Sequence, residues 1–133
     1  MKSRILIVED DKNMHEIYDD IFATTGGRYE LIFAVSVAEA VDKLNNENFD
    51  LVILDIIMEP ISGAYLYLKL NQDEKLKTKN IPVIIVSIMG EKKLSYLKKI
   101  GDVCIFEKPI EKESFLQKVE GLIETKKERG GRL

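Results

Sequence analysis

Residues 51–55 read Leu-Val-Ile-Leu-Asp, a run of four apolar residues that stops at a carboxylate. Two runs of the same kind are Ile-Leu-Ile-Val at residues 5–8 and Val-Ile-Ile-Val at residues 83–86. Continuous rather than alternating apolar residues are typical of strands that helices cover on both faces of a parallel sheet. These three runs therefore predict the middle strands of such a sheet.

Five apolar runs in all alternate with helical patterns along the chain. We expect strands at residues 5–8, 29–34, 51–54, 81–86 and 103–106. Apolar residues recur at the spacing of amphipathic helices in residues 14–22, 37–44 and 115–123, and weaker patterns predict helices around residues 64–71 and 92–100. Strands that alternate with helices predict βαβ units, and hence an α/β fold with a parallel sheet.

The composition limits the number of domains. A chain of 133 residues, 45% of them hydrophobic, fits one domain, which we expect over residues 1–125. Residues 126–133 carry charge and glycine and little that can be buried. We expect a flexible tail, a linker stub or an expression remnant there.

The charge balance and the apolar runs limit the kinds of partner. With 20 basic and 23 acidic residues the net charge is −3, so no positive field is available to hold a nucleic-acid backbone. No run approaches the roughly 18 apolar residues that a membrane span needs. The single cysteine, Cys104, cannot form an intrachain disulfide. We therefore expect a cytoplasmic protein without a direct nucleic-acid or membrane partner.

Acidic residues follow two of the predicted strands. Glu9, Asp10 and Asp11 come directly after the first strand, and Asp55 comes directly after the third. Ligands of open parallel sheets bind beyond the carboxyl ends of the strands, so at least three carboxylates converge if these two strands are neighbours. Carboxylates that close raise one another's pKa unless a cation joins them, and Mg²⁺ prefers such oxygen ligands. The alternative is that residues 9–11 are solvated strand-end or N-cap residues.

The fourth and fifth predicted strands end in a hydroxyl and a cation. Ser87 ends the fourth strand, and Lys108 follows the fifth. Taken singly, Ser87 is more often a turn residue and Lys108 a solvated charge. Carboxylates, a hydroxyl and an ammonium at one edge nevertheless suit a phosphoryl group, because phosphoryl transfer requires mainly positioning and charge neutralisation.

The arrangement of these motifs resembles the response-regulator receiver domain of two-component signalling, from about residue 4 to residue 123. The matching segments are residues 5–10, Ile-Leu-Ile-Val-Glu-Asp; residues 51–55, Leu-Val-Ile-Leu-Asp; Gly63; residues 83–87, Val-Ile-Ile-Val-Ser; and Lys108-Pro109. The resemblance implies a doubly wound (βα)5, flavodoxin-like fold. Its five-stranded parallel sheet has the order 2-1-3-4-5, with helices on both faces.

The resemblance also implies a phosphoacceptor and a metal site. Asp55 would take a phosphoryl group from a sensor histidine kinase or a phosphotransfer protein. Mg²⁺ would be held by Asp10, Asp55, Glu9 and the backbone carbonyl of Ile57, with Asp10 rather than Glu9 as a direct ligand. Apart from its own phosphorylation and slow dephosphorylation, such a domain is not an enzyme.

The remaining implied roles concern the phosphoryl group and the output. Ser87 would bind the phosphoryl group on activation, Lys108 would pair with its oxygens, and the Lys108–Pro109 peptide bond would be cis. The output would be a conformational change that alters a face near the fourth helix, the fifth strand and the fifth helix. That face would dock a downstream protein or an effector domain, and a homodimer is possible.

Several residues depart from the family pattern. Ile105 stands at the switch position, where the family usually has an aromatic residue, and Ile88 replaces a small residue after the hydroxyl. Pro60 falls one residue later than the family proline. Ile57 and Met89 flank the site and are both apolar, so we expect the phosphorylated form to decay slowly.

Three other interpretations were weighed. Ile88 and Ile105 together suggest a phosphorylation-independent, receiver-like binding scaffold. A phosphatase with an aspartyl nucleophile needs a second acid where Ile57 stands, and a flavin protein needs a phosphate-binding loop where the first strand runs into acidic residues. The phosphatase and the flavin protein are therefore disfavoured.

His15 lies beside the apolar stripe of the first helix, and we expect a solvated flank residue rather than a phosphodonor.

Overall fold

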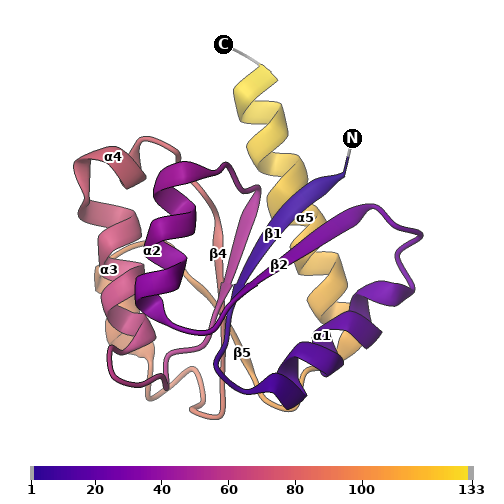
Figure 1. Ribbon diagram of the computed structural model, residues 1–133, viewed down its shortest axis with the longest axis horizontal. Coiled ribbons are helices and arrows are strands. Elements are labelled where there is room, and N and C mark those ends of the chain that lie inside the picture. Colours follow the sequence, from indigo (N-terminus) through magenta and orange to yellow (C-terminus); the bar gives the residue numbers. More distant parts are fainter. Residues whose placement is uncertain (1, 132–133) are drawn as a thin grey trace.

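A five-stranded parallel sheet forms the centre of the computed structural model, which describes residues 2–131 (Figure 1). The strands run in the order β2-β1-β3-β4-β5, which confirms the predicted order. Their bounds are β1 (Ser3–Val8), β2 (Tyr29–Ala34), β3 (Leu51–Leu54), β4 (Val83–Ser87) and β5 (Cys104–Glu107). The strands predicted at residues 81–86 and 103–106 thus begin and end one or two residues later in the structure.

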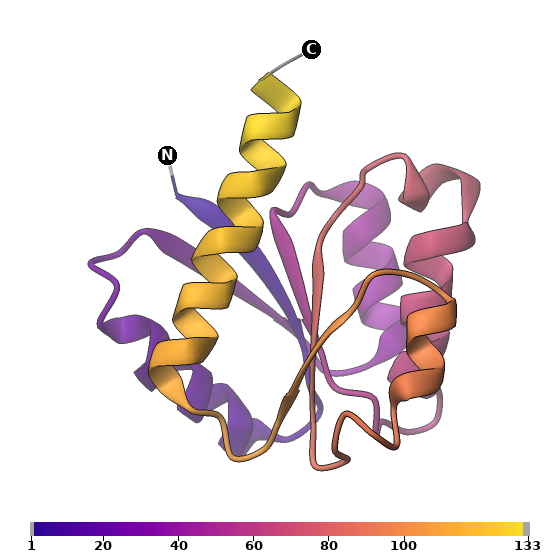
Figure 2. The same ribbon diagram turned by 180° about the vertical axis from the view of Figure 1, so that it is seen from behind.

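Helices cover both faces of the sheet (Figures 1 and 2). Their bounds are α1 (Lys12–Ala23), α2 (Val37–Asn46), α3 (Gly63–Gln72), α4 (Glu74–Lys77), the 3₁₀ helix η1 (Ser95–Lys99) and α5 (Lys112–Gly131). Side chains of β1 alternate between the faces, as the pleat of a strand requires. Ile5 and Ile7 pack in the core under α1 and α5, whereas Leu6 and Val8 pack in the core under α2 and α3.

Short polar side chains begin the helices near the carboxyl ends of the strands. The Asp11 carboxylate accepts a hydrogen bond from the Asn13 N–H at 2.9 Å and caps α1. The Ser36 and Ser62 hydroxyls accept hydrogen bonds in the same way at the starts of α2 and α3. Each cap satisfies a backbone N–H that has no partner within the helix. Thus α1 and α2 start within a few residues of the strands before them, whereas α3 starts after the longer segment of residues 55–62.

The segment between β4 and β5 differs from the expected helix at residues 92–100. Only the short 3₁₀ helix η1 forms there. Leu94 and Leu97 are fully buried and lie three residues apart, and Ile100 follows at the same interval. A 3₁₀ helix has three residues per turn, so this spacing places all three on one face. A further element, α4, was not predicted; the Asp73 carboxylate caps its first turn.

The expected tail at residues 126–133 begins instead as helix, because α5 continues to Gly131. Two lysines in this part contact the body of the molecule. Lys126 Nζ donates to the Phe49 carbonyl at 3.1 Å, and Lys127 Nζ donates to Ser3 Oγ at 3.0 Å. Residues 132–133 lie outside the described residues. Within residues 2–131, every helix is too short or too polar to cross a membrane.

Candidate functional site

Glu9 and Asp55 lie side by side because they continue neighbouring strands by one residue. Val8 of β1 is in register with Leu54 of β3, and the Asp55 N–H donates to the Val8 carbonyl at 3.1 Å. On the other side of β1, the Glu9 N–H donates to the Ala34 carbonyl at 2.9 Å. One carboxylate oxygen from each of Glu9, Asp10 and Asp55 can be chosen so that all three lie within 4.8 Å of one another.

The three carboxylates differ in burial. Glu9 is 2% exposed and Asp55 is 7% exposed, whereas Asp10 is open to solvent. Burial raises the pKa of Glu9 to about 6, and the charge of Asp55 acts in the same direction. The hydrogen bond from Lys108 opposes this rise. Asp11, the fourth acidic residue of the sequence motif, caps α1 as described above.

Lys108 brings a cation to the buried carboxylates from the segment after β5. Its backbone N–H donates to the Ser87 carbonyl at 2.9 Å. Its Nζ donates to Glu9 Oε1 at 2.9 Å and to Asp55 Oδ2 at 3.4 Å. Burial alone would lower the pKa of Lys108, but the hydrogen bond to Glu9 and the nearby negative charges raise it overall. The Lys108–Pro109 peptide bond is cis, the conformation that the family resemblance implies.

The donor set fits a hard divalent cation. Three carboxylates and one ammonium leave two negative charges when Glu9, Asp10 and Asp55 are ionised beside Lys108. Carboxylate oxygens are the ligands that Mg²⁺ prefers, and the exposed Asp10 leaves one side open to water molecules that Mg²⁺ retains. Near this cluster, the Ile57 N–H donates to Asp55 Oδ1 at 3.1 Å, so one oxygen of that carboxylate is held by the following loop.

Ser87 and Gly63 are also at this edge. Ser87 is fully buried, and its hydroxyl accepts a hydrogen bond from the Met89 N–H at 3.2 Å. Gly63 begins α3, and its N–H donates to the Ile56 carbonyl at 3.0 Å. A Cβ atom on Gly63 would overlap the Asp55 carbonyl oxygen. Only glycine allows this close approach of α3 to the backbone of Asp55.

Departures from the family pattern lie around the carboxylates. Ile88 is 67% exposed, so most of its side chain is turned toward solvent. Ile105 is half-buried and packs against the core under α2 and α3. Ile57 is about half exposed, and Met89 is partly buried. The Glu59–Pro60 peptide bond after Asp55 is cis.

Sequence reasoning did not anticipate the position of His15. The expectation of a solvated flank residue is wrong, because His15 is half-buried and its ring stacks on Phe33 with centroids 4.3 Å apart. Its Nε2 lies 2.7 Å from the Glu9 carbonyl oxygen, which makes Nε2 the protonated ring nitrogen in this hydrogen bond. His15 therefore links α1 and β2 to the backbone of Glu9. The position of His15 directly after Met14 of the apolar stripe was a signal of its partial burial. Nothing in that stripe indicated that His15 contacts Phe33 and Glu9.

Comparisons with known proteins agree on one family. The model of the response regulator receiver domain matches residues 5–120. The polar-differentiation response regulator DivK of Brucella ovis is 28% identical over 124 residues, which cover 92% of this chain and 98% of that protein. The response regulator TrrA of Thermotoga maritima, solved in complex with Mg²⁺-BeF, is 29% identical with a TM-score of 0.76. That comparison covers 92% of this chain and 99% of TrrA.

A more distant structure supports the fold. The receiver domain of a Luxo repressor protein from Vibrio parahaemolyticus has a TM-score of 0.85 at 21% identity. It covers 98% of this chain and 96% of its own. At that identity the likeness concerns the arrangement of strands and helices, which is shared over nearly the whole of both chains.

Proposed function

Because the chain belongs to the response regulator receiver domain family, we propose that it is a phosphorylation-switched signalling module with Asp55 as its phosphoacceptor. The observation that carries this proposal is the way both oxygens of the Asp55 carboxylate are held. Oδ1 accepts from the Ile57 N–H at 3.1 Å, and Oδ2 lies 3.4 Å from Lys108 Nζ. A carboxylate fixed in this way at an edge of the sheet is oriented for attack on an incoming phosphorus atom.

Glu9, Asp10, Asp55 and the backbone carbonyl of Ile57 would hold Mg²⁺. When bound, Mg²⁺ supplies positive charge beside the transferring phosphoryl oxygens. The description of TrrA in complex with Mg²⁺-BeF supports this choice of metal. The fit of the carboxylate cluster to a hard divalent cation supports it independently.

The side chains divide the remaining work of phosphoryl transfer. An oxygen of Asp55 forms a bond to phosphorus while the bond between phosphorus and the donor imidazole nitrogen breaks, and the imidazole keeps the electron pair. Lys108 Nζ, already beside Asp55 Oδ2, would stabilise the charge on the phosphoryl oxygens. The Ser87 hydroxyl accepts from the Met89 N–H, which leaves its own O–H to donate to one of those oxygens. The donor would be a sensor histidine kinase or a phosphotransfer protein in the cytoplasm.

The output would be a change of the face formed by η1, β5 and α5, read by a downstream protein. Ile105 of β5 packs against the core where an aromatic switch residue is usual, so the change at this position would be smaller than the turning of a ring. That same residue favours the second candidate function, a receiver-like scaffold that binds its partner without phosphorylation.

Intact-protein mass spectrometry with acetyl phosphate tests the proposal. We expect one acid-labile phosphoryl addition in the presence of Mg²⁺ and none in EDTA. Asp55→Asn should abolish the addition, whereas Asp50→Asn, which changes a carboxylate at the opposite end of β3, should leave it intact. If no phosphoryl group is added from acetyl phosphate or from a panel of histidine kinases, the phosphorylation-switched module is ruled out and the phosphorylation-independent scaffold is the function.

A further inference from the structure

The last turns of α5 place two cations on the helix face that packs against the sheet. Phe115 and Val119 are buried on this face, and Leu122 is partly buried. The same spacing of three and four residues continues with Lys126 and Arg129. Residues three, four and seven positions apart share one side of a helix. The apolar stripe of α5 is therefore followed by two basic residues, of which Lys126 is partly buried and Arg129 is exposed.

Lys126 and Arg129 line a cavity of about 400 Å³ at the amino ends of β4 and β5. Its other walls come from α3 and from the segment that leads into β4, where Ile81 and Pro82 supply apolar surface. Figure 2 shows the last turns of α5 at the same end of the molecule as this segment. The volume of the cavity is in the range of small-molecule sites, and its lining is mostly polar, with apolar surface at Leu70, Ile81 and Pro82.

The charges that line this cavity are out of balance. Lys77, Lys126 and Arg129 face it, against one lining carboxylate, Asp102, and Lys77 Nζ already pairs with Glu74 Oε1 at 3.1 Å outside the cavity. Among residues 2–131, Lys126 and Arg129 take part in no ion pair. Burial lowers the pKa of Lys126, and the positive charge of Lys79 acts in the same direction, whereas the negative charge of Asp50 opposes this decrease. Its hydrogen bond to the Phe49 carbonyl leaves two of its three donors for a ligand.

A buried hydroxyl at the same cavity has no partner. Tyr67 of α3 is 2% exposed and lines the cavity, and its hydroxyl forms no hydrogen bond with the described residues. The hydroxyl oxygen lies 2.8 Å from the point where a Cβ of Gly101 would stand, and the Asn71 side chain lies closer still to that point. An unpaired buried hydroxyl is costly, so native structures usually satisfy it with a neighbouring group, water or a ligand.

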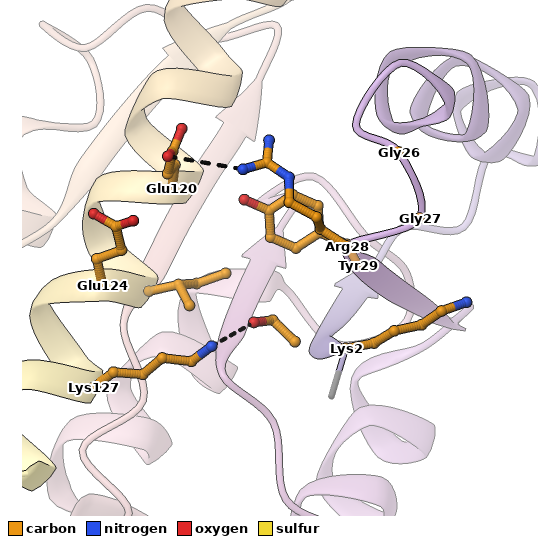
Figure 3. Close-up of a pocket in the computed structure, with 10 residues that line it drawn as sticks. Lys2, Gly26, Gly27, Arg28, Tyr29, Glu120, Glu124 and Lys127 are labelled. Carbon is orange, nitrogen blue, oxygen red and sulfur yellow. Dashed lines mark hydrogen bonds and ion pairs between the residues drawn. The ribbon is translucent and has the colours of Figure 1, made fainter.

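A second cavity, of about 450 Å³, lies on the other side of α5 and provides the contrast (Figure 3). There two of the three basic side chains, Arg28 and Lys127, meet partners within the cavity. Arg28 Nη1 lies 3.8 Å from Glu120 Oε1, and Lys127 Nζ donates to Ser3 Oγ (Figure 3). Glu124 adds a second carboxylate on the same helix. The second cavity therefore has two carboxylates for its three cations, whereas the cavity that Lys126 faces has one carboxylate for three.

We propose that the cavity between α3, β4 and α5 binds a small phosphomonoester, with the phosphate against Lys126 and Arg129 and the organic group against Ile81 and Pro82. Lys126 and Arg129, the two lining cations that take part in no ion pair among residues 2–131, suit a dianion, and a phosphomonoester carries close to two negative charges at neutral pH. The guanidinium of Arg129 can donate two parallel hydrogen bonds to phosphate oxygens. The Tyr67 hydroxyl supplies a further donor from the opposite wall.

Phenyl phosphate, which joins a phosphate to an apolar ring, is the probe for this site. We expect saturable binding in an NMR titration of the Asp55→Asn protein in EDTA, conditions that exclude phosphorylation and metal-bridged binding at residues 9, 10 and 55. Shifted amides should cluster in residues 67–71, 80–83 and 122–129. Benzoate, a monoanion with the same ring, should bind at least tenfold more weakly, about 1.4 kcal/mol less favourably.

Variants of adjacent lysines make the test specific. Lys126→Gln and Arg129→Gln should each weaken phenyl phosphate binding about tenfold, whereas Lys127→Gln, the same change of charge on the next residue, should leave it unchanged. Tyr67→Phe should weaken binding severalfold without lowering the melting temperature, because the hydroxyl it removes has no partner among the described residues. Equal effects at 126 and 127, equal binding of benzoate, or amide shifts without saturation would each overturn the proposal.

Discussion

At the carboxyl end of the sheet each buried charge lies against an opposite charge, whereas at the amino end the cations of α5 do not. Glu9 and Asp55 share the ammonium of Lys108, with distances of 2.9 and 3.4 Å. Lys126 Nζ donates a hydrogen bond to the Phe49 carbonyl. Neither Lys126 nor Arg129 forms an ion pair with the described residues. The first end is therefore stabilised before any ligand binds, while the second has capacity left for an anion. The predictions below test this difference, from the largest expected effect to the smallest.

Removal of the shared cation should cause the largest loss of stability. Lys108→Met leaves Glu9 and Asp55 buried without their counter-charge, and breaking a buried pair costs about 3–5 kcal/mol. Urea unfolding at pH 7.5 in EDTA measures the loss. The loss of stability should be smaller at pH 5, because Glu9 binds a proton there and no longer needs the counter-charge of Lys108.

The matched change at the other end is Lys126→Met. It removes one hydrogen bond to a carbonyl and no ion pair within the described residues, so a loss of about 1 kcal/mol is expected. Equal losses for the two variants, or a Lys108→Met loss that does not depend on pH, would remove the distinction between the two ends.

Two glycines give a second comparison. Gly63→Ala drives a Cβ into the backbone carbonyl oxygen of Asp55, and we expect a loss of about 1–3 kcal/mol together with slower phosphorylation. Gly101→Ala meets the ends of two side chains, the flexible Asn71 and the buried Tyr67, rather than backbone atoms, so its loss should be smaller. Thermal unfolding of both variants and the phosphorylation rate of each measure these effects. A larger loss at Gly101 would mean that the amino end is the more rigid one.

Glu9 should make stability depend on pH. The pKa of Glu9 rises from 4.5 to about 6 in the folded protein, so the folded state binds this proton more tightly than the unfolded state. The resulting stability is fully present below about pH 4.5 and is lost as the pH rises through about 6, a change of roughly 2 kcal/mol. The difference between wild type and Glu9→Gln, followed by urea unfolding in EDTA, isolates it. If the free energy of unfolding of the two proteins changes with pH in the same way, the pKa of Glu9 is not raised by folding.

Ile88 should have the smallest effect on stability. Because 67% of its surface is exposed, Ile88→Ala should change the free energy of unfolding by less than about 0.5 kcal/mol. Its rate of phosphorylation by acetyl phosphate should also stay close to that of wild type, since the side chain is turned toward solvent. A marked acceleration would show that Ile88 obstructs the approach to Asp55.

The strands and their chemistry could be predicted because a parallel sheet brings all carboxyl strand ends to one edge. Glu9, Asp55 and Ser87 each stand next to an apolar run, Lys108 stands two residues after one, and the structure brings all four to that edge. The spacing of Leu94 and Leu97 is compatible with a 3₁₀ helix, whereas the weak pattern over residues 92–100 predicts a longer helix than the five residues of η1. Short helices such as α4 depend on a single cap, Asp73, which carries little signal in a sequence.

The basic cavity could not be predicted, because its parts come from α3, the start of β4 and the last turns of α5. Lys126 and Arg129 looked like members of a charged tail when only local composition was considered. Their position became informative once α5 was seen to continue to Gly131 and to keep one face toward the sheet. Likewise, nothing near His15 in the sequence pointed to Phe33, its stacking partner on β2.

The most direct test of the central claim identifies the residue that receives the phosphoryl group. The protein is treated with acetyl phosphate and Mg²⁺, reduced with borohydride, which converts an aspartyl phosphate to homoserine, and mapped by peptide mass spectrometry. We predict homoserine at position 55 alone, and its loss when Lys108 is replaced by methionine or Mg²⁺ is removed. Homoserine at position 10 or 11, or none at any position with an active histidine kinase as donor, would contradict the assignment of the acidic end as a phosphoacceptor site.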